Sequence, residues 1–320
     1  MTDAPLAVVA DIGGTNTRVA LCRGTVVDTV SIRRFRNADH AGIEPVLQAY
    51  LADTGAQPQA VCVDMAGPVS NGVGRLTNLD WRVSADGLAA ATGASTVAVL
   101  NDLQAQGMAV GSLGSDGLQT LLPGAAQASD AARLVVNVGT GLNAQPVYRK
   151  GGNTIVHPSE AGHVSIPAQT ADELALRDWL SDQHAGGQTP GLEDILSGRG
   201  LERVDAWVGA GAAPRAAADI LTALKAKEAR ATRAVTVFVT LCGRYTGDLA
   251  LITQPVGGIY LVGGVIRHLG PHLTELGFEN AFRDKGRFAG FMDRFAIHIV
   301  TDDYAALTGC AVYLAEQMAA

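Results

Sequence analysis

The sequence predicts an α/β protein built from two domains. Three observations lead to this expectation: a length of 320 residues, short apolar runs that alternate with helix-like periodic segments, and repeated glycine turns after apolar strands. A domain commonly has about 150 residues, so the chain has room for about two domains, each with its own core. Strands that alternate with helices are typical of a sheet that contains parallel strands.

Composition narrows the class of protein. Hydrophobic residues make up 48% and charged residues 17%, and the net charge is −7, from 24 basic and 31 acidic side chains. An acidic chain without a basic stripe is not expected to bind nucleic acid. No apolar run approaches the roughly 20 residues of a membrane span. The first residues carry no basic leader segment, so we expect a cytoplasmic protein that is neither exported nor membrane-bound.

The four cysteines are expected to be reduced. Cys22, Cys62, Cys242 and Cys310 lie in apolar runs and show no C-x-x-C spacing. This pattern is typical of buried thiols rather than of disulfides or zinc ligands.

The N-terminal third predicts the first domain. A β-meander is expected from Leu6 to Ile32, with a second strand after the first glycine turn and a third over 25–32. After it we expect a helix over 43–51, a strand over 60–65, a loop or strand pair over 76–83, a helix capped by Ser84 and ending near 91, and a strand over 96–100. The stretch 111–130 is rich in small residues and predicts the crossing between domains.

The remaining chain predicts the second domain. We expect strands over 118–122, 134–138, 144–148, 259–262 and 295–300, and helices over 170–184, 228–252, 264–276 and 304–318. The last helix is expected to return to the first domain. Two strand–glycine–strand hairpins, over 6–22 and 134–148, suggest an internal duplication.

The first glycine turn predicts a phosphate site. It reads Asp11-Ile12-Gly13-Gly14-Thr15-Asn16 and lies between two apolar strands. Adjacent glycines let backbone N–H groups approach an anion, and Asp11 is placed to face a metal ion. The alternative, a Rossmann dinucleotide site, needs a G-x-G-x-x-G turn that opens a helix, whereas a strand follows here.

Two polar pairs are candidates for the chemistry. Asn101 and Asp102 follow a buried strand, where open α/β sheets place ligand-contacting groups, and Asp102 is the candidate general base. The same pair also suits a helix cap. Glu160 and His163 flank a short flexible turn that suits a polyhydroxyl ligand, whereas as a zinc site they lack further ligands. Glu193 alone is compatible with a helix that a glycine ends.

These clusters occur in the same order in the bacterial glucokinases of the hexokinase-type, actin-like ATPase superfamily, which the chain resembles nearly end to end. The resemblance is carried by Asp11 to Asn16, Leu76 to Asn78, Asn101-Asp102, Gly139-Thr140-Gly141, Glu160 to His163, Glu193 to Gly198, Gly258, Gly263-Gly264 and Phe282 to Phe288. No cysteine-rich cluster follows His163, which disfavours the zinc-containing relatives. Asn143 and Ala161 stand where family members commonly have glycine, and Asp302 to Ala305 replaces a frequent Asn-Pro-Gly.

The resemblance implies a two-domain actin-like ATPase (ribonuclease H-like) fold with a cleft between a small domain, residues 1–112 plus 302–320, and a larger one, residues 113–301. It further implies that ATP is bound by Asp11, Gly13, Gly14, Thr15, Asn16, Gly139, Thr140, Gly141, Gly263 and Gly264, with Mg²⁺ near Asp11. D-glucose would be held by Asn101, Asp102, Glu160, His163 and Glu193. A homodimer is also implied.

The leading hypothesis is therefore a glucokinase that transfers the γ-phosphoryl group of ATP to the 6-hydroxyl of D-glucose in the first step of glycolysis. A kinase for a related hexose, a sugar-sensing regulator and an actin-like assembly protein are the alternatives. A DNA-binding regulator would need a helix-turn-helix, and none precedes the strand that begins at Leu6.

Overall fold

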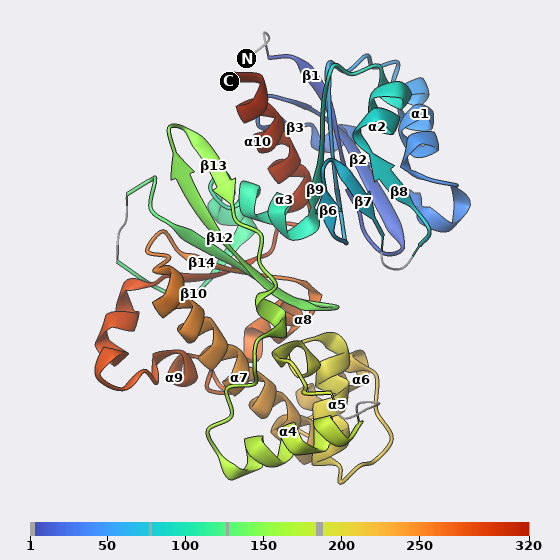
Figure 1. The fold of residues 1–320 in the computed structure, drawn as a ribbon. Coiled ribbons are helices and arrows are strands. Elements are labelled where there is room, and N and C mark those ends of the chain that lie inside the picture. Colours follow the sequence, from blue (N-terminus) through green and yellow to red (C-terminus); the bar gives the residue numbers. More distant parts are fainter. Residues whose placement is uncertain (1–3, 77–78, 126–127, 184–187, 320) are drawn as a thin grey trace. The chain divides into compact units, whose positions relative to one another are not determined.

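The chain forms two compact units, which we describe separately (Figure 1). The computed structural model describes residues 4–76, 79–125, 128–183 and 188–319. The first unit comprises Met1–Gly114, Arg149–His157 and Asp302–Ala320, and the second comprises Ser115–Tyr148 and Pro158–Thr301. Residues 149–157, which the sequence analysis counts with the larger domain, thus group with the first unit. Thr77 and Asn78 of one family motif, and the expected helix end at His184, lie outside the described residues.

The first unit is built on a mixed sheet in the order β3-β2-β1-β5-β9, with β4 also paired to β2, and on a small sheet β6-β7-β8. Strand β1 runs antiparallel to β2 and parallel to β5, which is parallel to β9. The strands are β1 (Leu6–Ile12), β2 (Asn16–Arg23), β3 (Val26–Val27), β4 (Arg33–Arg36), β5 (Ala60–Met65), β6 (Val69–Ser70), β7 (Val73–Arg75), β8 (Arg82–Ser84), β9 (Thr96–Asn101) and β13 (Asn153–Val156). The helices are α1 (Ile43–Thr54), α2 (Ala85–Thr92), α3 (Asp102–Ala109) and α10 (Ala305–Ala319).

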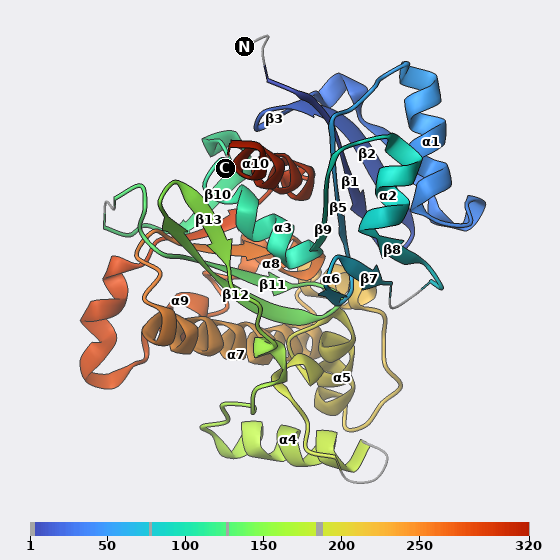
Figure 2. The same ribbon diagram turned by 45° about the horizontal axis from the view of Figure 1, so that its top comes forward.

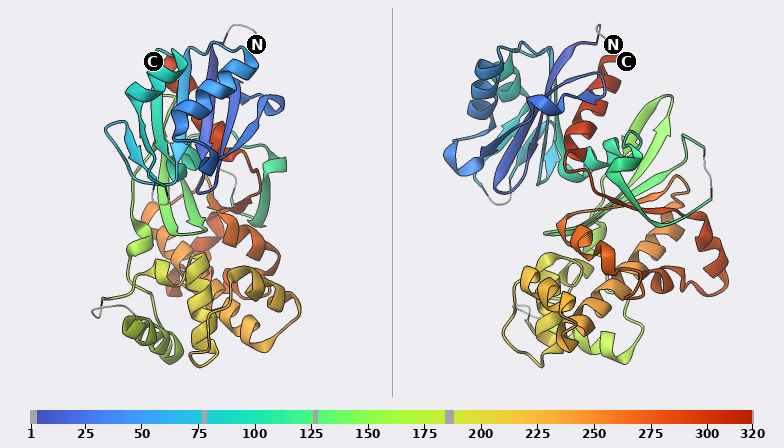
Figure 3. Two further views of the ribbon diagram at one scale, coloured as in Figure 1. Left: turned by 90° about the vertical axis from the view of Figure 1, so that its right-hand side faces the viewer. Right: turned by 180° about the vertical axis from the view of Figure 1, so that it is seen from behind.

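Successive residues of β1, β2, β5 and β9 face two different cores in the first unit. Val8 and Ala10 of β1 pack with residues of α1 and α2, whereas Ala7 and Val9 pack with residues of α3 and α10. Figures 1 and 3 show these helix pairs on opposite faces of the sheet. Because side chains alternate along a strand, Asp11 continues the series of Ala7 and Val9 toward α3 and α10.

The expected strand over 25–32 is wrong beyond Val27. Residues 29–31 form a 3₁₀ turn instead, in which the Asp28 side chain accepts from the Val30 N–H at 3.0 Å. The Ser31 hydroxyl accepts from the Leu21 N–H at 2.9 Å. Short polar side chains thus take over backbone hydrogen bonds that a ladder would make. The chain then returns as β4 beside the first half of β2.

The second unit contains the sheet β10-β15-β14-β11-β12, which β13 extends at the end of β12. Strand β11 is antiparallel to β12 and parallel to β14, which is parallel to β15. This pattern repeats that of β2, β1, β5 and β9, as the predicted duplication requires. The strands are β10 (Leu118–Leu122), β11 (Arg133–Val138), β12 (Leu142–Lys150), β14 (Ile259–Val262) and β15 (Ile297–Val300). The helices are α4 (Ala171–Gln183), α5 (Gly198–Val208), α6 (Ala217–Lys225), α7 (Ala229–Thr253), α8 (Gly264–Leu269) and α9 (Phe278–Arg283).

Helix α7 is the central helix of the second unit, where α5 and α6 pack toward one end and α9 toward the other (Figure 2). Its buried residues include Val235, Phe238 and Cys242, but Ile252, expected on the same face, is 76% exposed because the helix end leaves the core. In the described part of the chain α7 is long and apolar enough to cross a membrane, contrary to the expectation that no segment is. However, 67% of the apolar stretch of α7 is buried inside the structure, as is common for a core helix.

Three local predictions have clear outcomes. Ser84 caps α2 by accepting from the Gly87 N–H at 3.2 Å, as predicted. All four cysteines are buried and free, as expected. The helix expected over 264–276 is too long: α8 ends at Leu269 and a 3₁₀ turn follows, because Pro271 has no N–H to continue the helix.

Candidate active site

The turn between β1 and β2 presents open backbone in the first unit. The Gly13 N–H donates to the Asn16 carbonyl oxygen at 3.0 Å, which closes the turn. Gly14 and Thr15 at its tip are exposed. The turn therefore offers N–H groups to an anion, as the sequence predicts for a phosphate site.

Asn37 holds this turn in place through hydrogen bonds. No pattern in the sequence had indicated this role. Its side-chain amide donates to the Gly13 carbonyl at 2.8 Å, and its backbone N–H donates to the Thr15 carbonyl at 2.9 Å. The Thr17 hydroxyl donates to its Oδ1 at 2.8 Å. Asn37 is buried, so these bonds fix the turn from both sides.

Asp11 lies at the end of β1 beside a cation and a second acid. Arg18, the residue of β2 that pairs with Asp11, donates to Asp11 Oδ2 at 3.2 Å and to the Asp303 carbonyl at 3.2 Å. Burial raises the pKa of Asp11, although the Arg18 charge opposes the shift. On the other side, Asp64 of β5 is in register with Asp11.

Asp64 is a fully buried acid that the sequence analysis read only as part of an apolar strand. The Cys310 thiol of α10 donates to its Oδ2 at 3.4 Å, and its Oδ1 has no hydrogen-bond partner among the residues that the structure describes. Burial, followed by the charge of Asp11, raises the pKa of Asp64 well above its usual value. An aspartate within an otherwise apolar run was the signal that could have singled it out.

Asn101 and Asp102 stand where β9 passes into α3. Asn101 is the cap: its Oδ1 accepts from the Leu103 N–H at 3.1 Å and its amide donates to the Gly67 carbonyl at 3.0 Å. Each of its polar atoms retains capacity for one more hydrogen bond. Asp102 Oδ1 also accepts from the Leu103 N–H, at 2.8 Å. Burial is the main cause that raises the pKa of Asp102, to about 6.

The second unit carries the other glycine turns. The Gly139 N–H donates to the Gly141 carbonyl at 3.0 Å. Gly263 has φ +107°, and a Cβ there would lie 2.5 Å from the Val138 carbonyl oxygen, so only glycine fits. A Cβ on Gly139 would lie 3.6 Å from Gly263 Cα, whereas one on Gly264 would meet nothing within 4 Å. The structure thus places 139–141 beside 263–264, with open space at Gly264.

Glu193 is tied to the same glycine turn. Its Oε2 accepts from the Leu142 N–H at 2.8 Å, and a Cβ on Gly141 would lie 2.7 Å from that oxygen. The reading of this segment as a helix with a glycine stop is wrong. Leu192–Asp194 is a 3₁₀ turn, and Gly198 begins α5 because the Ser197 hydroxyl caps it by accepting from the Gly200 N–H at 3.0 Å.

Glu160 precedes a 3₁₀ turn, Ala161–His163, and His163 ends it, next to the segment that carries Glu193. Both side chains are exposed, and neither has a polar partner in the described part of the chain. A Cβ on Gly162 would lie 1.9 Å from the Leu142 carbonyl oxygen, so this turn is pressed against the start of β12. The Leu192 N–H donates to the Val164 carbonyl at 2.9 Å. The structure thus gathers Glu160, His163 and Glu193 around the first residues of β12.

The predicted site residues therefore form two groups. The first unit holds Asp11, Gly13, Gly14, Thr15, Asn16, Asn101 and Asp102, and the second holds Gly139, Thr140, Gly141, Glu160, His163, Glu193, Gly263 and Gly264. Among the residues that the structure describes, no three His, Cys, Asp or Glu side chains are grouped so as to hold a metal ion by themselves.

Comparison with known proteins identifies the family. The family model described as Glucokinase matches residues 8–317. A glucokinase of Pseudomonas paraeruginosa is 32% identical over 98% of this chain and 93% of its own length. The crystal structure of a glucokinase from an Antarctic psychrotroph has a TM-score of 0.86, with 28% identity, 98% of this chain and 99% of that chain covered.

A glucokinase of Balamuthia mandrillaris, solved in complex with glucose, shares the fold, with a TM-score of 0.78, 23% identity, and 98% and 94% of the two chains covered. The expected two-domain α/β fold of the actin-like ATPases is thereby confirmed. Because the family model and a curated relative both match nearly the whole sequence, the chain belongs to the glucokinase family.

Proposed function

We propose that the protein transfers the γ-phosphoryl group of ATP to the 6-hydroxyl of D-glucose, which yields glucose 6-phosphate and ADP. One observation carries this beyond family membership: the carboxyl group of Asp102 stands at the end of a sheet strand with its pKa raised to about 6. A base with a pKa near the working pH is suited to accept the proton of a sugar hydroxyl.

We assign different roles to the site residues of the first unit and to those of the second unit. In the first unit the turn from Gly13 to Asn16 binds phosphate oxygens. Asp102 takes the proton of the sugar 6-hydroxyl while the oxygen of that hydroxyl bonds to the γ-phosphorus and ADP departs. In the second unit Gly139 to Gly141 also binds phosphate, and Gly263 and Gly264 lie by the adenosine. Asn101, Glu160, His163 and Glu193 bind the sugar hydroxyls. Support comes from the side chains of Glu160 and His163, which are exposed and have no polar partner among the described residues.

Magnesium is proposed to accompany ATP. Mg²⁺ on a nucleotide is usually held by one or two carboxylates together with phosphate oxygens and water, so a protein cage is not needed. Asp11 fits this requirement, because it is the second-last residue of β1 and so lies beside the phosphate turn. When bound, the ion would neutralise charge on the phosphate oxygens.

We propose that the two compact units correspond to the small and larger kinase domains, and that the protein is a cytoplasmic homodimer acting at the first step of glycolysis. Four buried free cysteines support a reducing compartment. The dimer rests on the family resemblance, and light scattering on the purified protein tests it: a single species of about twice the mass of 33.0 kDa is expected.

A substrate panel tests the function. Purified protein with Mg-ATP is assayed for ADP release with glucose, mannose, fructose and N-acetylated hexoses. We expect the highest kcat/KM with glucose and the product glucose 6-phosphate. ADP release that no hexose stimulates would refute the kinase assignment, and a clear preference for another hexose would refute the substrate.

A further inference from the structure

The segment that carries Glu160 and His163 is held at one residue, Ala161, by two distant side chains. We call residues 159–163 the sugar loop. At its centre, the Ala161 N–H donates to Asn143 Oδ1 at 3.0 Å, and the Ala161 carbonyl accepts from the Tyr245 hydroxyl at 2.9 Å. Each backbone group of Ala161 therefore has a hydrogen-bond partner outside the loop, and its N–H also donates to the Ser159 hydroxyl within the loop at 3.1 Å.

Asn143 engages both of its polar atoms at this place. Its Oδ1 accepts from the Ala144 and Ala161 N–H groups, at 2.8 and 3.0 Å, and its Nδ2 donates to the Ser159 carbonyl at 2.6 Å. Two N–H donors meet the oxygen and a carbonyl meets the nitrogen, so only one orientation of the amide is compatible with its surroundings. Asn143 thus joins two residues of the sugar loop to β12.

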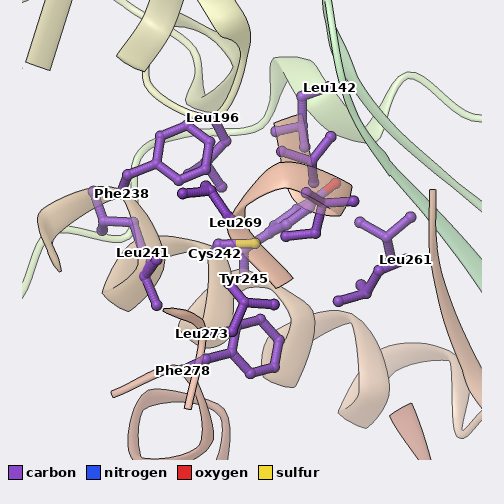
Figure 4. Close-up of a cluster of buried hydrophobic side chains, with 14 of the residues drawn as sticks. Leu142, Leu196, Phe238, Leu241, Cys242, Tyr245, Leu261, Leu269, Leu273 and Phe278 are labelled. Atoms are coloured by element: carbon purple, nitrogen blue, oxygen red, sulfur yellow. The ribbon is translucent and has the colours of Figure 1, made fainter. Parts of the chain in front are cut away.

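Tyr245 holds the loop from the other side. It is 3% exposed and lies with Leu142 in the main core of the second unit, on α7 (Figure 4). The preceding residue, Arg244, donates to the Pro167 carbonyl at 2.7 Å and pairs with the Glu173 carboxylate at 3.0 Å. Helix α7 therefore anchors the chain both within the sugar loop and just after it.

From this geometry we infer that Asn143 and Tyr245 are positioning residues that set glucose affinity by clamping Ala161, and so by fixing where Glu160 and His163 lie. The inference rests on the proposed function. Glu160 and His163 have no polar partner of their own in the described chain, so their placement depends on the backbone that carries them. A loop fixed in the binding geometry loses less entropy when its ligand binds.

The test compares two buried tyrosines. Tyr245→Phe removes the hydroxyl that holds Ala161. Tyr50→Phe is the matched control, because Tyr50 is 1% exposed and its hydroxyl also donates to a backbone carbonyl at 2.9 Å, that of Ser31 in the first unit. Each variant loses one buried hydrogen bond, so their thermal midpoints should fall by similar small amounts.

Glucose affinity should separate the two variants. By calorimetry, Tyr245→Phe is expected to raise the glucose dissociation constant about fivefold to tenfold, with kcat within about twofold of wild type, and Tyr50→Phe to leave both unchanged. Asn143→Ala should raise the constant at least as much. The effect of the double variant should be smaller than the product of the two single effects, because both side chains hold the same residue, Ala161.

Hydrogen exchange of the sugar-free protein provides a readout that needs no ligand. Both Asn143→Ala and Tyr245→Phe should speed exchange of peptides that cover 159–163, whereas Tyr50→Phe should not. Unchanged exchange, or unchanged glucose affinity in the two loop variants, would overturn the clamp. Faster exchange in a protein whose wild type binds no glucose would instead refute the proposed function and the link to glucose affinity.

Discussion

Asp102 should set the acid limit of catalysis. Burial raises its pKa from 3.8 to about 6, the nearby negative charge of Asp11 adds to the shift, and the hydrogen bond from the Leu103 N–H opposes it. A general base acts only in its ionised form, so activity is lost as the pH falls through about 6. Roughly nine-tenths of the groups are ionised at pH 7 and about one-tenth at pH 5.

The measurement is kcat/KM for glucose between about pH 5 and pH 8, because this constant reports ionisation of the free enzyme. We expect a tenfold fall for each pH unit below about 6. Circular dichroism at each pH is the control that separates titration from acid unfolding. A profile that stays flat down to about pH 5 would refute the assignment of a raised pKa to the catalytic base.

Three further substitutions have expected outcomes. Gly14→Val should raise the KM for ATP with little change in thermal midpoint, because Gly14 is exposed at the tip of its turn and a branched side chain would occupy the place of a phosphate; an unchanged KM would count against the phosphate role. Glu160→Gln and His163→Ala should weaken glucose binding in calorimetry without lowering stability, since both side chains are exposed; wild-type affinity in both would remove them from the sugar site. Arg244→Met should lower the free energy of unfolding in urea by about 3–5 kcal/mol, because it leaves the buried Glu173 carboxylate without its cation. A loss below about 1 kcal/mol would contradict that role, and adding Glu173→Gln should recover part of the loss.

Local patterns in the sequence were enough to predict much of the fold. The capping box at Thr170 and Glu173 is present, with the Glu173 N–H donating to Thr170 Oγ1 at 3.2 Å. Buried strands such as β5 and β9 read directly as short apolar runs. By contrast, β4 carries three exposed arginines among its four residues, and only its pairing with β2 makes it a strand.

The supporting parts of the candidate site could not be predicted, because they depend on contacts between residues far apart in sequence. Tyr245 reads as one more apolar position of α7, yet its hydroxyl meets a carbonyl 84 residues away. Asn37 supports a turn that lies 24 residues before it. An acid within the apolar run of β5 marks Asp64 as unusual, but only the pairing of β5 with β1 places it beside Asp11.

Substitution of Asp102 by asparagine tests the central claim most directly. Asparagine keeps the shape and can still accept from the Leu103 N–H, as Asp102 does at 2.8 Å, but it cannot take a proton from the sugar. We expect kcat, followed by formation of glucose 6-phosphate, to fall about 10²–10⁴-fold, while the glucose dissociation constant from calorimetry changes less than about threefold. Near-normal turnover in Asp102→Asn would contradict the account, because Asp102 would then serve only the start of α3.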